Sequence, residues 1–341
     1  MNVKSDGTGS GDVSGKHAPA LSPTVPHALR ELLAVRGEFS EGWATLDTDT
    51  VSTFEDLFRE IGGRGKAILE IGSGYGFTCV LLALLGAAEV HGIEVIPSAV
   101  QAAERVARRA GQHLSVFFQQ ADVSRGLPFG DRRFDVVLLI EVLSHIVVSD
   151  LGSFLREVVR VVRPGGLVVV SDGNNARSWK RRRENYRLWE RFDQGPPTEG
   201  DDTVYSHRIA TPYVALRRAI AQTAAPSLRP EEADAIAART FGFDASEVEV
   251  AARRFVDTGA WPQSPFRRGV CPVEPRHRMY IEQLLDPLEI RRHLWAAGCD
   301  EVTCGPRRAL PLKRLWTVAP WLTFLIANGF KIIAKKGGTA P

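Results

Sequence analysis

Cysteine is scarce in this chain, which has four among its 341 residues. None belongs to a CxxC pair and none has a histidine at metal-ligand spacing; they are Cys79, Cys271, Cys299 and Cys304. This sparse pattern argues against both a zinc site and a disulfide framework. We therefore expect no bound metal, and we expect reduced thiols in a cytoplasmic protein.

An excess of one charge sign is also lacking, because 43 Lys and Arg residues face 40 Asp and Glu residues, for a net charge of +3. So small an excess gives no global field that would attract nucleic acid or a membrane surface. No apolar run near the start resembles a signal peptide, and none elsewhere is long enough to span a bilayer. The first residues are rich in Gly and Ser, and we expect a disordered tail over 1–25.

What the chain does contain is a regular alternation of short apolar runs and helical patterns. Strands are predicted at 67–71, 89–95, 114–122, 134–143 and 167–172, and helices at 77–87, 97–110 and 150–162. An earlier helix is predicted over 52–61, where Ser52 and Glu55 have capping-box spacing. Strands that alternate with helices predict an α/β protein with a parallel sheet covered on both faces.

Three glycines, Gly72, Gly74 and Gly76, follow the first predicted strand directly. In an open parallel sheet the carboxyl ends of the strands line the ligand crevice, so a bare main chain at this point favours cofactor contact over a simple tight turn. The dinucleotide fingerprint is GxGxxG, and Phe77 stands where its last glycine would be. A nicotinamide cofactor is therefore disfavoured.

These motifs resemble those of the class I S-adenosylmethionine-dependent methyltransferases, and among them the small-molecule group that includes the ubiquinone and menaquinone methyltransferases. The resemblance covers roughly 50–172 and 286–336, and it includes GxGxG after an acidic strand end, later strand-end acids and the "RPGG" element. It implies a Rossmann-like sheet of seven strands, mostly parallel with an antiparallel last strand, and S-adenosyl-L-methionine as the cofactor.

The resemblance also implies which residues contact that cofactor. Glu94 would take the ribose hydroxyls, Asp122 the adenine amino group, and Glu70 would lie near the methionine amino group. From the residues alone, Asp122 is equally compatible with a turn or cap, and Glu70 with a buried acid that touches no cofactor. The implied cofactor set is Glu70, Gly72, Ser73, Gly74, Gly76, Glu94, Val95, Asp122, Val123 and Glu141.

Methyl transfer depends mainly on alignment of donor and acceptor, and a base is needed only where the acceptor must lose a proton. Glu141 and His145 follow the fourth strand and face the crevice, which makes them the candidate catalytic residues. His145 is a base on one interpretation and a packed or capping residue on the other. Asp172, Asn174 and Asn175 stand at the crevice mouth and are candidates for contact with the acceptor.

We divide the chain after the tail into a core over 26–172, a helical cap inserted over 173–285, and the completion of the core over 286–341. The cap emerges from the carboxyl end of a strand, so it is expected to lie over the crevice and select substrates. Its basic run, 180–183, is compatible with binding an anionic or sugar-linked acceptor, although such a run usually forms a solvated face.

One apolar segment, 311–328, separates the last two predicted strands. Lys313 and Arg314 precede two tryptophans, a pattern compatible with weak peripheral membrane contact or with a lipid-like acceptor. Pro320 interrupts the pattern, and packing against the cap is the plainer interpretation. The sequence thus favours a methyltransferase that acts on a small apolar or lipid-like molecule, with an anionic or sugar-linked acceptor as the alternative. A non-catalytic cofactor-binding regulator is the alternative from another class, and the oligomeric state is open.

Overall fold

The computed structural model describes residues 57–195, 203–204, 207–208, 211–265, 270–307 and 320–338. The predicted tail over 1–25 and the capping residue Ser52 lie outside these ranges, as does the first half of the apolar segment 311–328. The helix predicted over 52–61 is described from residue 57, where it is helical as far as Ile61.

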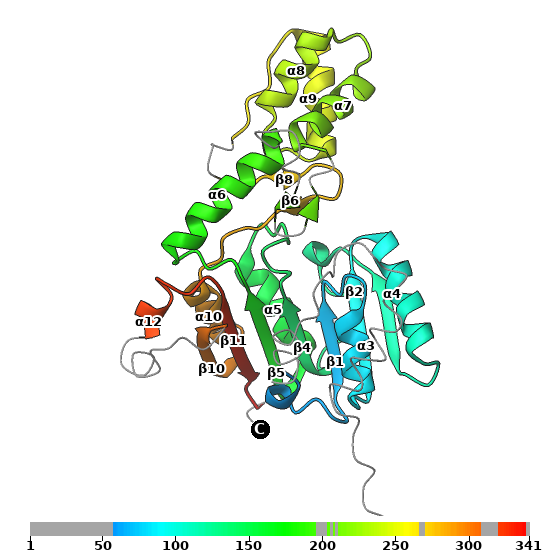
Figure 1. The fold of residues 1–341 in the computed structure, drawn as a ribbon, viewed down its shortest axis with the longest axis vertical. Helices are drawn as coiled ribbons and strands as arrows, with labels where there is room; N and C mark the ends of the chain where they lie inside the picture. The colour runs from blue at the N-terminus through cyan, green and yellow to red at the C-terminus, as the bar shows by residue number, and fades with distance from the viewer. Residues whose placement is uncertain are drawn as a thin grey trace, which may run out of the picture.

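Seven strands form one sheet in the order β10-β11-β5-β4-β1-β2-β3. β11 runs antiparallel to both neighbours and the β1, β2, β3, β4 and β5 pairings are parallel, so the predicted fold class is confirmed (Figure 1). The strands are β1 (Ala67–Ile71), β2 (Glu89–Glu94), β3 (Val116–Gln120), β4 (Phe134–Ile140), β5 (Val162–Asp172), β10 (Cys299–Pro306) and β11 (Phe330–Lys336).

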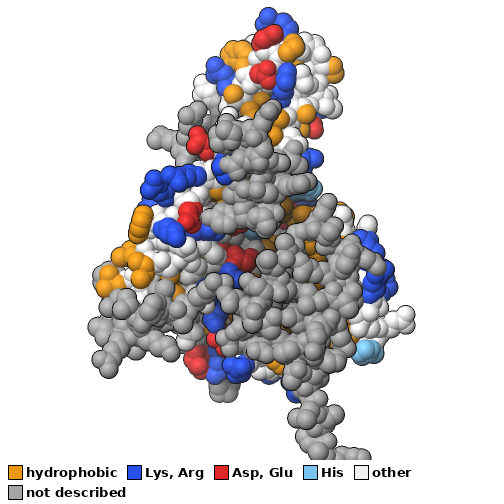
Figure 2. Space-filling model, viewed as in Figure 1, with side chains coloured by type: hydrophobic (Ala, Val, Ile, Leu, Met, Phe, Trp, Pro, Cys, Tyr) orange, Lys and Arg blue, Asp and Glu red, His pale blue; other side chains and the backbone are white. Residues whose placement is uncertain are grey.

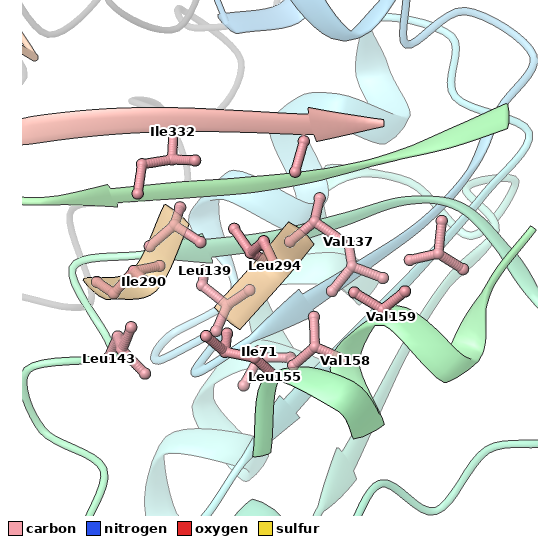
Figure 3. Close-up of a cluster of buried hydrophobic side chains, with 14 of the residues drawn as sticks. Ile71, Val137, Leu139, Leu143, Leu155, Val158, Val159, Ile290, Leu294 and Ile332 are labelled. Carbon is pink, nitrogen blue, oxygen red and sulfur yellow. The ribbon is translucent and has the colours of Figure 1, made fainter. Parts of the chain in front are cut away.

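Helices cover both faces of the sheet, as the continuous apolar strands require. On one face Leu69 and Ile71 of β1 pack in the same cluster as residues of two helices, α5 (Leu151–Val161) and α10 (Pro287–Ala296), and Figure 3 shows part of this cluster. On the other face Ile68 packs with α3 (Phe77–Leu84). A fourth helix, α4 (Pro97–Ala110), packs beside α3 and matches its predicted bounds.

The turn expected at "RPGG" is absorbed into β5. The pairing partner of Phe134 is Val162, yet Val136 pairs with Leu167, so the register slips across residues 163–166. Gly165 has a φ of 74°, a left-handed conformation that glycine adopts without steric cost. The sequence therefore located the chain reversal correctly but not the irregular pairing that accommodates it.

The insertion after β5 is helical, as predicted, and Figure 1 shows it extending above the sheet. It contains α6 (Trp179–Gln194), α7 (Tyr213–Ala224), α8 (Pro230–Arg239) and α9 (Ala245–Thr258), with short strand pairs β6 (Thr203–Val204) with β7 (His207–Arg208) and β8 (Val273–Glu274) with β9 (Met279–Tyr280). α9 begins with a capping box: the Asp244 carboxylate accepts from the Glu247 N–H, and the Glu247 carboxylate accepts from the Asp244 N–H.

A buried ion pair joins three helices of the cap. Arg217 of α7 is fully buried, and its Nη1 lies 2.7 Å from Asp193 Oδ1 at the end of α6. Its Nε donates to the carbonyl of Ala237 in α8. A buried charge is tolerated only when it is paired in this way, so Arg217 is central to the packing of the cap.

The described part of the apolar C-terminal segment contains α12 (Pro320–Thr323) and packs on the core. Phe324 is buried in the main cluster, whereas Leu325 and Ile326 are exposed. The described residues of this segment contact both parts: the Phe324 side chain belongs to the core cluster, while the carbonyls of Phe324 and Ala327 accept from Asn175 at the start of the insertion. Among the residues that the structure describes, no helix has the length and apolarity needed to cross a membrane.

Candidate active site

The candidate site lies where the carboxyl ends of β1, β2, β4 and β5 meet at one edge of the sheet, on the side from which the cap extends (Figure 1). In open α/β sheets this edge forms the ligand crevice. Two groups of predicted residues occupy it. One follows β1 and β2, and the other follows β4 and β5.

Two different reasons explain why the loop after β1 has glycine, with no side chain, at three positions. All three glycines have φ between 51° and 77°, which disfavours other residues. A Cβ at Gly72 would lie 2.0 Å from Val142, and one at Gly76 would lie 2.5 Å from Phe118, so these two are required by packing. A Cβ at Gly74 would meet nothing within 4 Å, so only Gly74 presents bare main chain to open space.

Glu94 at the end of β2 is fixed by the main chain around it. One carboxylate oxygen accepts from the N–H groups of Val95 and Ile96, at 2.8 and 3.0 Å, and the other accepts from Gly74 at 3.1 Å. A carboxylate has about four lone-pair sites, so the oxygen that faces Gly74 can still accept from a ligand. The structure thus joins Glu94 to the glycine loop, as the predicted ribose contact requires.

Glu70 is buried beneath the same loop, and its carboxylate accepts from Cys79 Sγ at 3.0 Å. Burial raises the pKa of Glu70 to about 7, and hydrogen bonds from Cys79 and Thr78 oppose that rise. A nearby cation would restore its negative charge. This environment suits a group that responds to a positively charged ligand, and its contact with a methionine amino group stays a prediction.

Asp122 takes the capping role that the sequence left open. It precedes the single 3₁₀ turn Val123–Arg125, and its carboxylate accepts from Ser124 N at 3.0 Å and Ser124 Oγ at 2.7 Å. Arg125 Nε lies 3.2 Å from the other oxygen. The residue therefore shapes the loop after β3, and contact of Asp122 or Val123 with the cofactor stays a prediction.

Glu141 follows β4 in a left-handed conformation, with a φ of 51°. Its carboxylate pairs with Arg307 at the end of β10 and accepts from the N–H of Gly173 at 3.1 Å. A non-glycine residue at positive φ is strained, and the surrounding contacts hold it there. Glu141 is thus linked to both β5 and β10 at the crevice, a partnership that its sequence neighbours do not indicate.

His145 is held by a segment that returns from the cap. Its Nδ1 lies 3.0 Å from the carbonyl oxygen of Tyr280, and its own carbonyl accepts from the Tyr280 N–H at 2.9 Å. A carbonyl can only accept, so this contact assigns the proton to Nδ1 and leaves the lone pair on Nε2. About 30% of the side chain is exposed, which leaves the ring accessible.

Asp172 and Asn174 form a buried polar cluster with Glu282, a residue that sequence reasoning missed. Asp172 accepts from Ser144 N and Asn174 N, at 3.2 and 2.9 Å. Asn174 Nδ2 donates to both Asp172 and Glu282. Burial and then the charge of Glu282 raise the pKa of Asp172. No local motif marks Glu282, because its partners lie over a hundred residues away in the chain.

Asn175 points in another direction. It is fully buried, and its Nδ2 donates to the carbonyl oxygens of Phe324 and Ala327, at 2.7 and 2.6 Å. Its Oδ1 accepts from the N–H of Arg177. These bonds use the amide to anchor the segment before β11, so the geometry favours a structural role over the acceptor contact that we predicted.

Comparison with known proteins identifies the core. The family described as "Methyltransferase domain" matches residues 69–170, which include the glycine loop and run from β1 into β5. The chain carries a class I methyltransferase domain. Its cofactor is S-adenosyl-L-methionine, and the predicted family resemblance is confirmed.

Two curated relatives align with this methyltransferase domain. Norajmaline N-methyltransferase of Rauvolfia serpentina is 34% identical over 131 residues, which are 38% of this chain and 44% of the relative. Ubiquinone biosynthesis O-methyltransferase of Bradyrhizobium sp. (strain ORS 278) is 38% identical over 116 residues, 34% of this chain and 42% of the relative. The chain thus spans less than half the length of either relative.

Among solved structures, an S-adenosylmethionine-dependent methyltransferase from Mesorhizobium loti is similar over 84% of this chain and 97% of its own, at 15% identity and a TM-score of 0.41. The strand order and the antiparallel β11 establish the methyltransferase fold independently of that overlap.

The residues of the methyltransferase domain fit its cofactor. Gly74 offers main chain with free space beside it, and Glu94 lies within hydrogen-bond distance of that main chain. Ser73 Oγ is buried and has no hydrogen-bond partner among the described residues, as expected of a group that a ligand satisfies. Within the same ranges, no group of three His, Cys, Asp or Glu residues is placed to hold a metal ion.

Proposed function

We propose that this protein transfers a methyl group from S-adenosyl-L-methionine to an oxygen or nitrogen atom of a small-molecule acceptor bound beneath the cap. One observation carries the proposal: the exposed main chain at Gly74, whose N–H donates to Glu94, lies at the same edge of the sheet as His145. The names of the relatives, an N-methyltransferase and an O-methyltransferase, support both acceptor atoms.

When bound, S-adenosyl-L-methionine supplies a methyl group on a positively charged sulfur, which is displaced in line by the acceptor atom. The glycine loop and Glu94 hold and orient that donor. Correct alignment of two reactants contributes roughly 7 to 11 kcal/mol to lowering a barrier, so the domain needs no covalent catalyst. Glu70, buried with its pKa near 7, is placed to compensate a ligand cation under the loop.

His145 is the base in this proposal. Its Nδ1 is committed to the Tyr280 carbonyl, so Nε2 is free to take the proton of an acceptor hydroxyl or ammonium group. Histidine titrates near neutral pH, which suits proton removal under physiological conditions. The proton of the acceptor would then pass to Nε2 as the acceptor atom takes the methyl group.

The acceptor class is proposed as small and apolar. A cavity of about 880 Å³ opens within the cap between α6 and α8. The aromatic residues Tyr186, Trp189 and Phe241 line it together with polar residues, which include Glu190 and Arg239. Binding sites for small molecules usually have volumes of 300 to 1,000 Å³. Trp189 also links this cavity to the core, because its Nε1 donates to the carbonyl of Glu282 at 3.0 Å.

An anionic or sugar-linked acceptor is the alternative. Figure 2 shows Lys and Arg side chains gathered over α6, and the exposed members of its basic run are Lys180, Arg182 and Arg183. Arg181 turns inward instead, and its guanidinium donates to Asn174 Oδ1. The inward contact makes Arg181 the member of the run best placed for an anionic acceptor.

The test is transfer of a radiolabelled methyl group from S-adenosyl-L-methionine into a cell extract, followed by separation into organic and aqueous phases. Label in the organic phase supports an apolar acceptor, and label in the aqueous phase supports the anionic alternative. Tight cofactor binding with no labelled fraction would make the protein a non-catalytic regulator. His145→Gln is expected to lower labelling at least about 100-fold, whereas His293→Gln on α10 serves as the control.

The four cysteines lie in the described ranges, and all are free. They support our proposal of a reducing, cytoplasmic location. The cap boundaries at 173 and 285 are likewise proposed as those of the acceptor-binding insertion.

A further inference from the structure

Glu282 is the one acidic residue that the cap contributes to the polar cluster described around His145 and Asp172. It lies between β9 and α10, where the chain returns from the cap to the core. Its carboxylate accepts from Asn174 Nδ2, and its Oε1 lies 4.0 Å from His145 Nε2. Only about 16% of its side chain is exposed. A carboxylate so placed acts on its neighbours rather than on solvent.

The backbone at Glu282 is held in an unusual conformation, with a φ of 149°. Its carbonyl oxygen accepts from Asn185 Nδ2 at 2.9 Å and from Trp189 Nε1 at 3.0 Å, both on α6. The next residue, Gln283, donates its N–H to the carbonyl of Ser144. Strain of this kind persists only where the surroundings fix it, and it gathers at functional sites.

We propose that Glu282 is a positioning residue through which the cap completes the active site: its carboxylate stabilises the positive charge formed when His145, held by the Tyr280 carbonyl, takes the acceptor's proton. This inference rests on the proposed function. The distance of 4.0 Å is too long for a hydrogen bond, so Nε2 keeps its lone pair for the acceptor. Opposite charges at this distance still attract appreciably at a partly buried site.

Other charged groups lie near the same cluster and affect the charges of its carboxylates. Asp172 lies on the core side; burial and then the charge of Glu282 raise its pKa, and the nearby His145 opposes that rise. Arg181 contributes a cation through Asn174 Oδ1. Glu141 lies beyond Gly173 and is paired with Arg307. Glu282 is the carboxylate with an oxygen 4.0 Å from His145 Nε2, and Asp172 is a second carboxylate near that ring.

The first experiment compares Glu282→Gln with Glu289→Gln, a matched control that removes the carboxylate of an exposed pair, 3.8 Å from His293. Catechol serves as the acceptor probe, because its hydroxyl must lose a proton. Glu282→Gln is expected to lower kcat about 10-fold and leave KM for S-adenosyl-L-methionine unchanged. The acid limb of its kcat profile should move to lower pH by about half a unit, since the imidazolium loses a stabilising charge.

The second experiment needs no turnover. The carboxyl carbon signal of Asp172, assigned with Asp172→Asn, is followed by ¹³C NMR as pH changes. Glu282→Gln should lower the midpoint of that titration, and Glu289→Gln should not. Glu282→Gln keeps the backbone contacts with Asn185 and Trp189, and unchanged cofactor binding by calorimetry will show that it is folded; Glu282→Asp replaces it otherwise.

The outcomes separate the two claims. A wild type that transfers no label in the cell extract, together with a shifted Asp172 titration in Glu282→Gln, would count against the proposed function while supporting the placement of Glu282. An active wild type whose kcat profile is unchanged by Glu282→Gln would overturn the inference. So would an Asp172 midpoint that does not move.

Discussion

The two sides of the crevice are built in different ways. On the cofactor side, the glycine loop and Glu94 hold each other through main-chain bonds between residues 20 positions apart or closer. On the proposed acceptor side, His145 and Asn174 contact Tyr280 and Glu282, which lie more than 100 positions away in the chain where it returns from the cap. The same edge of one sheet thus combines a local site with a long-range one.

This difference corresponds to two tasks: binding the methyl donor, which methyltransferases share, and binding the acceptor, which varies among them. The cofactor side depends on short segments that the sheet alone positions, so it can form without the cap. The acceptor side is complete only when the cap is folded and docked. A methyltransferase domain can therefore keep one donor site while an insertion decides which acceptor it serves.

The largest expected effect comes from breaking the cap alone. Arg217→Met leaves Asp193 buried without its partner, and loss of one member of a buried pair costs about 3 to 5 kcal/mol. We expect the cap to become sensitive to proteolysis while S-adenosyl-L-methionine still binds, as measured by calorimetry. The control is Arg218→Met, which changes the neighbouring residue of α7 and removes an exposed pair with Asp234 of α8. Loss of cofactor binding in Arg217→Met would contradict the independence of the two sides.

A change beneath the glycine loop should act on the cofactor side with a dependence on pH. The folded-state pKa of Glu70 is raised to about 7, so its contribution to stability is fully present below pH 4.5 and is lost as pH rises to 7. Glu70→Gln does not lose this stability, because glutamine does not ionise. It should be more stable than wild type by about 3 kcal/mol at pH 8 and equal to it near pH 4, in urea unfolding. Equal stability at pH 8 would show that Glu70 is not strained by burial.

Glu94→Ala tests the cofactor side of the crevice directly. The substitution removes the acceptor of three backbone N–H bonds and the proposed ribose contact. We expect the affinity for S-adenosyl-L-methionine to fall about 10 to 100-fold, which corresponds to about 1.4 to 2.8 kcal/mol. Calorimetry measures this affinity, with Glu104→Ala on the solvent-facing side of α4 as the control. Unchanged affinity would remove Glu94 from the cofactor site.

The smallest effect is expected on the outer face of α6. Arg182 and Arg183 are exposed, and solvated charges contribute little, so their double replacement by Gln should change stability by less than about 0.5 kcal/mol. Methyl transfer to the extract should also be unchanged. A selective loss of label from the aqueous phase would instead favour the anionic acceptor and make α6 part of the acceptor side.

Sequence patterns located most of the fold and one half of the site. The alternation of strands and helices predicted the core elements, and α4 matches its predicted bounds from Pro97 to Ala110. Glycine spacing and strand-end acids indicated Gly74 and Glu94, because both depend on short-range geometry. The roles of Asn175 and Asp122 were harder to predict, since a polar residue at a strand end serves equally as a ligand contact, a cap or an anchor.

The sequence by itself determined the parallel core, the bare loop after β1 and the acid beside it, because local periodicity and backbone freedom dictate these features. Only the tertiary structure decided which neighbours His145, Asp172 and Asn174 receive. Glu282 and Tyr280 reach them through the folded path of the cap, and no periodic pattern encodes a contact between such distant segments. The donor site follows from short-range chain geometry, whereas the acceptor site follows from packing.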